Sequence, residues 1–103
     1  MRPNIVVFLT DDHGPWAANC FGTPELRTPA LDSLVANGIY FPNAYTPSPV
    51  CSPARASFWT GMYPSQHGIH DWIDEKTFPK KWLPERLPTL ASSLHDGGYR
   101  TGF

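Results

Sequence analysis

The sequence predicts an α/β protein in which a mostly parallel sheet is flanked by helices. Three observations carry this prediction: an apolar run at residues 4–10 has the length of a buried strand, helical patterns follow it, and a last helix leads into another strand-like segment. Strands that alternate with helices along a chain are typical of parallel sheets. The 103 residues hold too few strands to cover both faces of such a sheet, so we expect an incomplete fold.

The first half of the chain should contain one strand and one helix. Residues 4–10 are apolar without alternation, which favours a central strand buried on both faces, and the turn-forming residues 11–15 end it. A helix should follow over residues 29–37, because Thr28 suits the N-cap, Pro29 the first turn and Gly38 the end. Residues 39–44 are expected to be a short extended segment.

The second half should contain two helices. One is expected to begin near Ser52 and Pro53 and to stop at Gly61, with proline at its start and glycine after its end. The other should run over residues 88–96, where apolar residues share one face (Leu87, Leu90, Ala91 and Leu94) and two glycines follow. Residues 99–103 look like the start of another strand.

Composition excludes several classes of protein. The net charge of −1 and the scattered lysines and arginines argue against binding to nucleic acid. The longest apolar run is too short to cross a membrane, and no secretion signal follows Met1, so we expect a cytoplasmic protein, or a periplasmic or secreted one if the true start lies upstream. Two cysteines are too few to predict a disulfide framework.

The most informative segment is Cys51-Ser52-Pro53-Ala54-Arg55. If Pro53 starts a helix, Cys51 lies just ahead of it, where backbone N–H groups and the helix dipole favour an anion such as sulfate or phosphate. If helical geometry extends back to Cys51, Arg55 lies on the same side, and its guanidinium suits an oxyanion. The alternative is an ordinary helix start with a buried thiol and a surface arginine.

A pair of carboxylates, Asp11 and Asp12, follows the first predicted strand. Neighbours on a strand point to opposite faces, so both can reach one ion only where the chain turns, and Gly14-Pro15 supplies a turn. Two carboxylates favour a hard cation such as Ca²⁺ or Mg²⁺, whereas the alternative is a pair of solvated turn residues. His13 is a candidate for supporting a metal ligand through a hydrogen bond, or a plain turn residue.

The segment from Cys51 to Gly61 resembles the signature of the sulfatase family: a cysteine, a proline two residues later, an arginine two residues after that, and a closing Thr-Gly pair. The resemblance extends from Pro3 to Gly102. It implies an alkaline-phosphatase-like fold, in which residues 1–103 are the N-terminal part of a single catalytic domain, truncated before the remaining active-site residues.

The same resemblance implies a reaction. A separate formylglycine-generating enzyme would read the Cys-x-Pro-x-Arg segment and oxidise Cys51 to formylglycine, whose hydrate attacks the sulfur of a sulfated small molecule or sugar. Arg55 would hold the modified side chain and stabilise charge. Asp11, Asp12 and the modified Cys51 would bind a divalent metal, most often calcium, with magnesium as the alternative. His67 matches a segment that follows the signature in many sulfatases, as a pocket residue or a structural loop histidine.

Two alternatives stay open. A phosphonate or phosphate monoester hydrolase of the same superfamily shares the metal site and differs in its substrate. A non-catalytic α/β fragment or binding module would keep Cys51 as an unmodified thiol. The lysine, histidine and further metal ligands that the resemblance implies cannot be assigned within these residues, so we expect the chain alone to be inactive and not stably folded.

Overall fold

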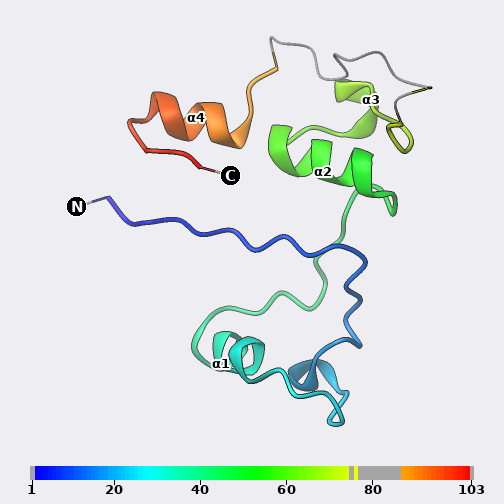
Figure 1. Ribbon diagram of the computed structural model, residues 1–103, viewed down its shortest axis with the longest axis vertical. Coiled ribbons are helices and arrows are strands. Elements are labelled where there is room, and N and C mark those ends of the chain that lie inside the picture. Colours follow the sequence, from blue (N-terminus) through cyan, green and yellow to red (C-terminus); the bar gives the residue numbers. More distant parts are fainter. Residues whose placement is uncertain (1, 75, 77–86, 103) are drawn as a thin grey trace. The chain divides into compact units, whose positions relative to one another are not determined.

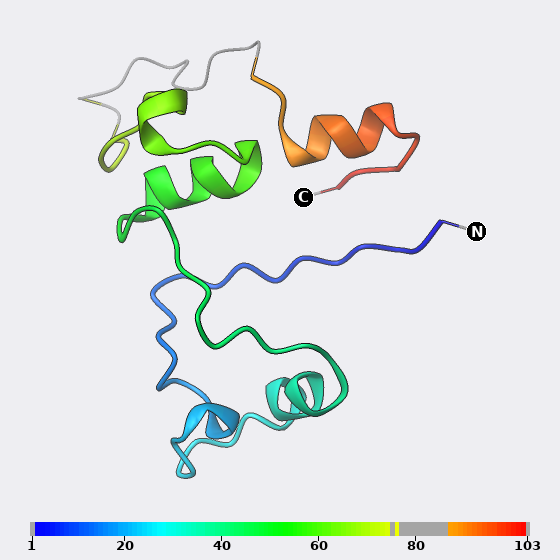
Figure 2. The same ribbon diagram turned by 180° about the vertical axis from the view of Figure 1, so that it is seen from behind.

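The computed structural model describes residues 2–74, 76 and 87–102 (Figure 1). The chain divides into two compact units, Met1–Ala44 and Tyr45–Phe103. The first contains the 3₁₀ helix η1 (Asn19–Phe21) and the helix α1 (Pro29–Asn37). The second contains the helices α2 (Cys51–Thr60), α3 (Pro64–His67) and α4 (Leu90–Asp96), which Figure 2 shows from behind. Within the described residues, no helix is long and apolar enough to cross a bilayer.

The segments predicted as strands do not form strands in the described part of the chain. Residues 4–10 run as an extended trace without secondary structure, and residues 99–102 also lack it (Figure 1). Residues 39–44, expected to be extended, contain a turn in which the N–H of Ala44 donates to the carbonyl of Phe41 at 3.3 Å. The apolar run is open to solvent, with Val6 75% and Phe8 88% exposed. A strand is completed by backbone hydrogen bonds to a neighbouring strand, which no described segment supplies. The predicted sheet is therefore not confirmed.

Two hydrogen bonds join η1 to the start of α1, and a third links their two acceptor side chains. The Thr28 hydroxyl donates to Oδ1 of Asp32 at 3.1 Å and accepts from the N–H of Asn19 at 3.0 Å. The N–H of Cys20 donates to the same carboxylate oxygen at 3.0 Å. The predicted bounds of α1 are confirmed, but Thr28 does not cap it through its side chain, because the hydroxyl is engaged in these bonds.

The helix α2 is the centre of the second unit and packs against both α3 and α4. It buries Pro53, Ala56 and Ser57, and the largest fully buried side chains of the described residues are Pro53 and Ile69. The helix begins at Cys51, so the prediction that Cys51 lies ahead of it is wrong. Pro53 fits inside the first turn because N–H groups there have no helical acceptor, which leaves nothing for proline to remove.

The helices α3 and α4 differ from expectation in small ways. The helix α4 begins at Leu90, two residues later than predicted, because Thr89 forms its N-cap and exchanges hydrogen bonds with Ser92 at 3.0 and 2.8 Å. The helix α3 was not predicted, since four residues are too few for a periodic pattern. Its signal was Pro64 at the first position and Gly68 after the end.

Gly61 is expected to stabilise the end of α2 through its backbone conformation. Its φ is 69°, in the left-handed region, and its N–H donates to the Ser57 carbonyl at 2.8 Å. A Cβ at this position would meet nothing within 4 Å, so the effect of Gly61→Ala is conformational. We expect this variant of the full-length protein to lose about 1 kcal/mol of unfolding free energy in denaturant titrations, since alanine disfavours this region.

The matched control is Gly102→Ala, where an added Cβ also meets nothing within 4 Å and no left-handed φ is involved. This variant should unfold like the unmodified protein. Equal losses in the two variants would contradict the assignment of Gly61 as a conformational helix end.

Candidate active site

The first turn of α2 brings two of the predicted site residues together. Cys51 is the first residue of the helix, and Arg55 follows four positions later in the same helix. Positions four apart lie on one face of a helix, so both residues share a side of α2. Both side chains are partly exposed. The condition set by the sequence, that helical geometry extends back to Cys51, is met.

The N-terminal end of α2 offers groups that favour an anion. The first helical bond runs from the N–H of Ala54 to the carbonyl of Val50 at 3.0 Å, so the N–H groups of Cys51 and Ser52 precede the ladder of helical bonds. The positive end of the helix dipole lies at the same place. Together with the fixed charge of Arg55, these groups suit a bound oxyanion.

His67 is buried against α2 and does not line an open pocket. Its side chain is 3% exposed, and its Nε2 is 3.0 Å from Oγ of Ser57, a buried residue of α2. Its Nδ1 accepts the N–H of Ile69 at 3.1 Å. Burial lowers the pKa of His67 below its usual value, His70 lowers it further, and a backbone hydrogen bond with Pro53 opposes the shift. His67 is therefore a buried residue whose environment favours the neutral ring.

The two carboxylates predicted to bind metal lie in the other unit. Asp11 and Asp12 are exposed, and Asp12 has a φ of 51°, so the chain already turns at Asp12, before Gly14. A turn at this position is the condition under which neighbouring carboxylates can serve one ion. His13 donates from Nε2 to the carbonyl of Ala17 at 3.0 Å, which fits its interpretation as a turn residue.

The donor set fits part of a hard-cation site. Carboxylate oxygens are the ligands that calcium and magnesium prefer, and a calcium ion takes about 6–8 oxygens. Among the described residues, no group of three or more histidine, cysteine, aspartate or glutamate side chains is placed to hold a metal ion. Asp11 and Asp12 alone would thus fill only part of a coordination shell. Cys20 and Cys51 are both free thiols.

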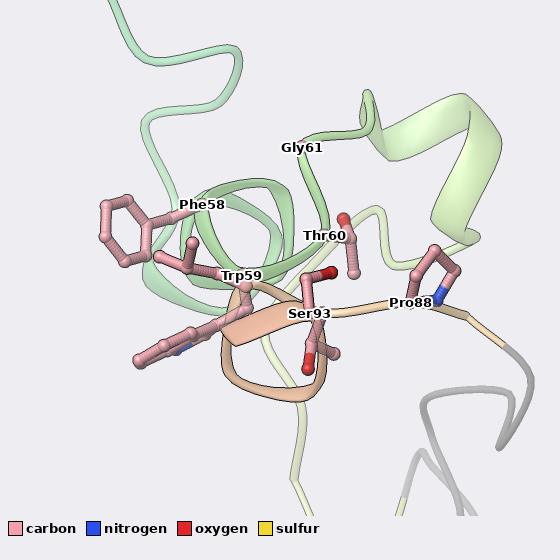
Figure 3. Close-up of a pocket in the computed structure, with 8 residues that line it drawn as sticks. Phe58, Trp59, Thr60, Gly61, Pro88 and Ser93 are labelled. Carbon is pink, nitrogen blue, oxygen red and sulfur yellow. The ribbon is translucent and has the colours of Figure 1, made fainter. Parts of the chain in front are cut away.

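A cavity at the other end of α2 contains none of the predicted site residues. It has a volume of about 290 Å³ and lies between the last turn of α2 and the start of α4 (Figure 3). Its walls include Phe58, Trp59 and Leu90. Phe58 is seven residues from Cys51, about 10 Å along a helix, so this cavity is separate from the first turn.

Two serines of α2 contribute contacts that the sequence did not reveal. Ser57 bonds to His67, and Oγ of Ser52 accepts the N–H of Ile73 at 3.1 Å. Ser52 stands inside the Cys-x-Pro-x-Arg segment, but no pattern in the sequence links either serine to a residue ten or more positions away.

The comparisons with known proteins agree on one family. The family model described as Sulfatase matches residues 3–103. The chain is 36% identical to the human steryl-sulfatase and 37% identical to human arylsulfatase A, with 97% of the chain covered in both cases. It is 34% identical to an N-acetylgalactosamine-6-O-sulfatase of Bacteroides thetaiotaomicron, over 98% of the chain.

These matches cover only 18–20% of the relatives' own length, so the chain spans about a fifth of each. No solved structure matches the chain. A family match over nearly all residues, together with relatives at this level of identity, shows that the chain belongs to the sulfatase family.

Proposed function

We propose that the protein containing these residues hydrolyses sulfate esters, and that Cys51 is the source of its nucleophile. The observation that carries the proposal is the first turn of α2, where Cys51 and Arg55 share one face of the helix. Membership of the sulfatase family supports the same reaction. When present, formylglycine made from Cys51 would supply a hydrated aldehyde as a covalent nucleophile.

The residues of α2 would bind and orient the anionic sulfate group. Arg55 offers forked N–H donors and a permanent charge, which suit the oxygens of sulfate. The N–H groups and dipole of the first turn add donors that are fixed before the substrate arrives. Such fixed donors stabilise charge that develops on oxygen as an ester bond breaks.

We propose that Asp11 and Asp12 contribute two carboxylates to a divalent metal site, with the modified Cys51 as a further ligand. Oxygen donors favour Ca²⁺ or Mg²⁺, and of these we propose Ca²⁺, as the family resemblance implies. A bound divalent cation would polarise the sulfate group. The left-handed backbone at Asp12, with a φ of 51°, supports this role, because residues held in uncommon backbone regions cluster at active sites and ligand sites.

We also propose that both units belong to one alkaline-phosphatase-like catalytic domain, of which residues 1–103 are the N-terminal part. The relatives are about five times longer than the region matched, which leaves ample chain to complete a sheet. The exposed apolar run at residues 5–9 supports this, since so much apolar surface is usually covered in a folded protein. By itself the 103-residue chain would then be inactive and not stably folded.

The proposed substrates are sulfated small molecules or sulfated sugars. The names of the relatives refer to a steryl sulfate ester, to aryl sulfates and to a 6-O-sulfated N-acetylgalactosamine. These names share the sulfate ester and differ in the alcohol that carries it. The proposal therefore commits to the sulfate ester, with a formylglycine-generating enzyme as the partner that prepares Cys51.

The test compares matched aryl sulfate and aryl phosphate esters as substrates of the full-length protein. We expect a higher kcat/KM for the sulfate ester, because the proposed site is built for a sulfate group. The two esters share the same leaving alcohol, so the comparison isolates the transferred group. A higher kcat/KM for the phosphate ester would overturn the sulfatase proposal and favour a phosphate or phosphonate monoester hydrolase.

A further inference from the structure

His67 joins α2 to the segment that follows α3 through both of its ring nitrogens. On one side, Nε2 is 3.0 Å from Oγ of Ser57, which is 7% exposed. On the other side, Nδ1 accepts the N–H of Ile69 at 3.1 Å. Ile69 is itself 1% exposed, so the imidazole lies inside the small core of this unit.

These contacts fix the protonation of the ring. A backbone N–H can only donate, so Nδ1 of His67 must be the unprotonated nitrogen. The proton of the neutral ring is therefore on Nε2, where it donates to Oγ of Ser57. Protonation of Nδ1 would place two donors face to face at Ile69.

A second bond ties the same segment to the first turn of α2. The N–H of Ile73 donates to Oγ of Ser52 at 3.1 Å. Ser52 is the neighbour of Cys51, and Ser57 follows Arg55 by two residues. The chain after α3 is thus bonded to α2 near both residues of the candidate site.

We propose that His67 is a positioning residue, which holds α2 in place, and with it Cys51 and Arg55, by joining Ser57 in the second turn to the chain at Ile69. This inference rests on the proposed function, because the positioned groups are Cys51 and Arg55. A direct catalytic role does not fit the geometry: both ring nitrogens are engaged within the protein, and the side chain is 3% exposed. Small displacements of reacting groups can lower rates about 10²-fold.

Amide variants of His67 separate its two contacts. An asparagine amide oxygen can replace Nδ1 as acceptor for Ile69, and a glutamine amide can replace Nε2 as donor to Ser57. His67→Leu removes both contacts and fills the same space with an apolar side chain of similar size. Ser57→Ala removes the hydroxyl of Ser57 and leaves the backbone hydrogen bond of His67 with Pro53, so it also guards against a His67→Leu variant that fails to fold. His95→Gln, at an exposed histidine of α4, is the matched control.

Activity is measured on the full-length protein. Each rate is divided by the amount of folded protein that carries the aldehyde at Cys51, as determined by mass spectrometry. We expect kcat to fall about 10- to 100-fold in His67→Leu, with partial recovery in His67→Gln and a smaller loss in Ser57→Ala. His95→Gln should match the unmodified protein. If kcat and KM, normalised in this way, are unchanged in both His67→Leu and Ser57→Ala, the positioning role is wrong.

The pH dependence of stability gives an independent readout. The ionisable groups of α2 are Cys51 and Arg55, α3 carries none besides His67, and His70 follows. With a lowered pKa in the folded state, His67 binds a proton more readily when unfolded, so stability should fall as pH drops below about 6.5. His67→Gln should lack this component of the fall, whereas an equal fall would contradict the buried, neutral assignment.

These measurements separate the two proposals. If the unmodified protein cleaves no sulfate ester, the proposed function fails, and the pH dependence still reports whether His67 is buried and neutral. Nitrogen chemical shifts of the ring, recorded on labelled full-length protein, should show the proton on Nε2. A proton on Nδ1 would contradict the bond from Ile69 and with it the positioning role.

Discussion

Replacing Cys51 by alanine in the full-length protein should abolish sulfate ester hydrolysis, with a fall in kcat of about 10⁴-fold or more. Removal of a covalent nucleophile has effects of this scale in other hydrolases, because the remaining binding groups cannot supply the reacting atom. Alanine retains the helix start, since it is the residue with the best helix propensity. We therefore expect kcat to fall while the amount of folded protein stays the same.

The control is Cys20→Ala, which removes the other free cysteine. Alanine keeps the hydrogen bond from the Cys20 backbone N–H to Asp32 and loses only the contact of the thiol with the same carboxylate. This variant should keep wild-type rates. Full activity in Cys51→Ala, or equal losses in the two variants, would rule out Cys51 as the nucleophile.

Mass spectrometry tests the modification without an activity assay. The tryptic peptide of residues 28–55 contains Cys51 as its only cysteine. In full-length protein from its own host, we expect the mass of the aldehyde at this position. A thiol mass throughout would support the alternative of a non-catalytic protein with unmodified Cys51.

The second large effect is expected at the carboxylates. Asp12→Asn should lower kcat/KM about 10²-fold or more and reduce the amount of bound divalent metal, because it removes one of the charges proposed to hold the ion. Even residues that only support a metal ligand change metal affinity or activity about 10–100-fold. Asparagine accepts the left-handed backbone found at Asp12, where φ is 51°, so the substitution changes charge and not conformation.

Metal content and rates are measured together, with calcium added in increasing amounts. Added calcium should restore part of the activity of Asp12→Asn. The control is Asp96→Asn, at the exposed last residue of α4, which should leave both quantities unchanged. Wild-type metal content and rates in Asp12→Asn would contradict the proposed site.

Local sequence patterns predicted the helices α1, α2 and α4, because the ends of these helices depend on nearby residues. Proline in the first turn and glycine after the last residue located α1 and α2, and α4 was misplaced by two residues at its start. The spacing of Cys51 and Arg55 placed both on one face of α2 once the helix was known to begin at Cys51. Family membership was also predicted from this segment and is confirmed by the comparisons.

Contacts between distant residues could not be predicted in the same way. The bond between Ser57 and His67 and the bond between Ser52 and Ile73 join residues 10 and 21 positions apart, and no periodic pattern encodes such pairs. The apolar run at residues 5–9 is a segment for which a local pattern predicted a structure that the described chain does not form. Its composition favours a buried strand, yet a strand needs partners, and only tertiary structure supplies them.

The sequence by itself therefore determined the helices α1, α2 and α4, the family and the residues proposed to carry the chemistry, since each depends on short-range spacing. Tertiary structure alone decided that His67 is buried with both ring nitrogens engaged and that Ser52 and Ser57 hold the chain after α3. The physical reason is that hydrogen bonds between segments require the chain to fold back on itself, and burial then fixes which groups remain neutral.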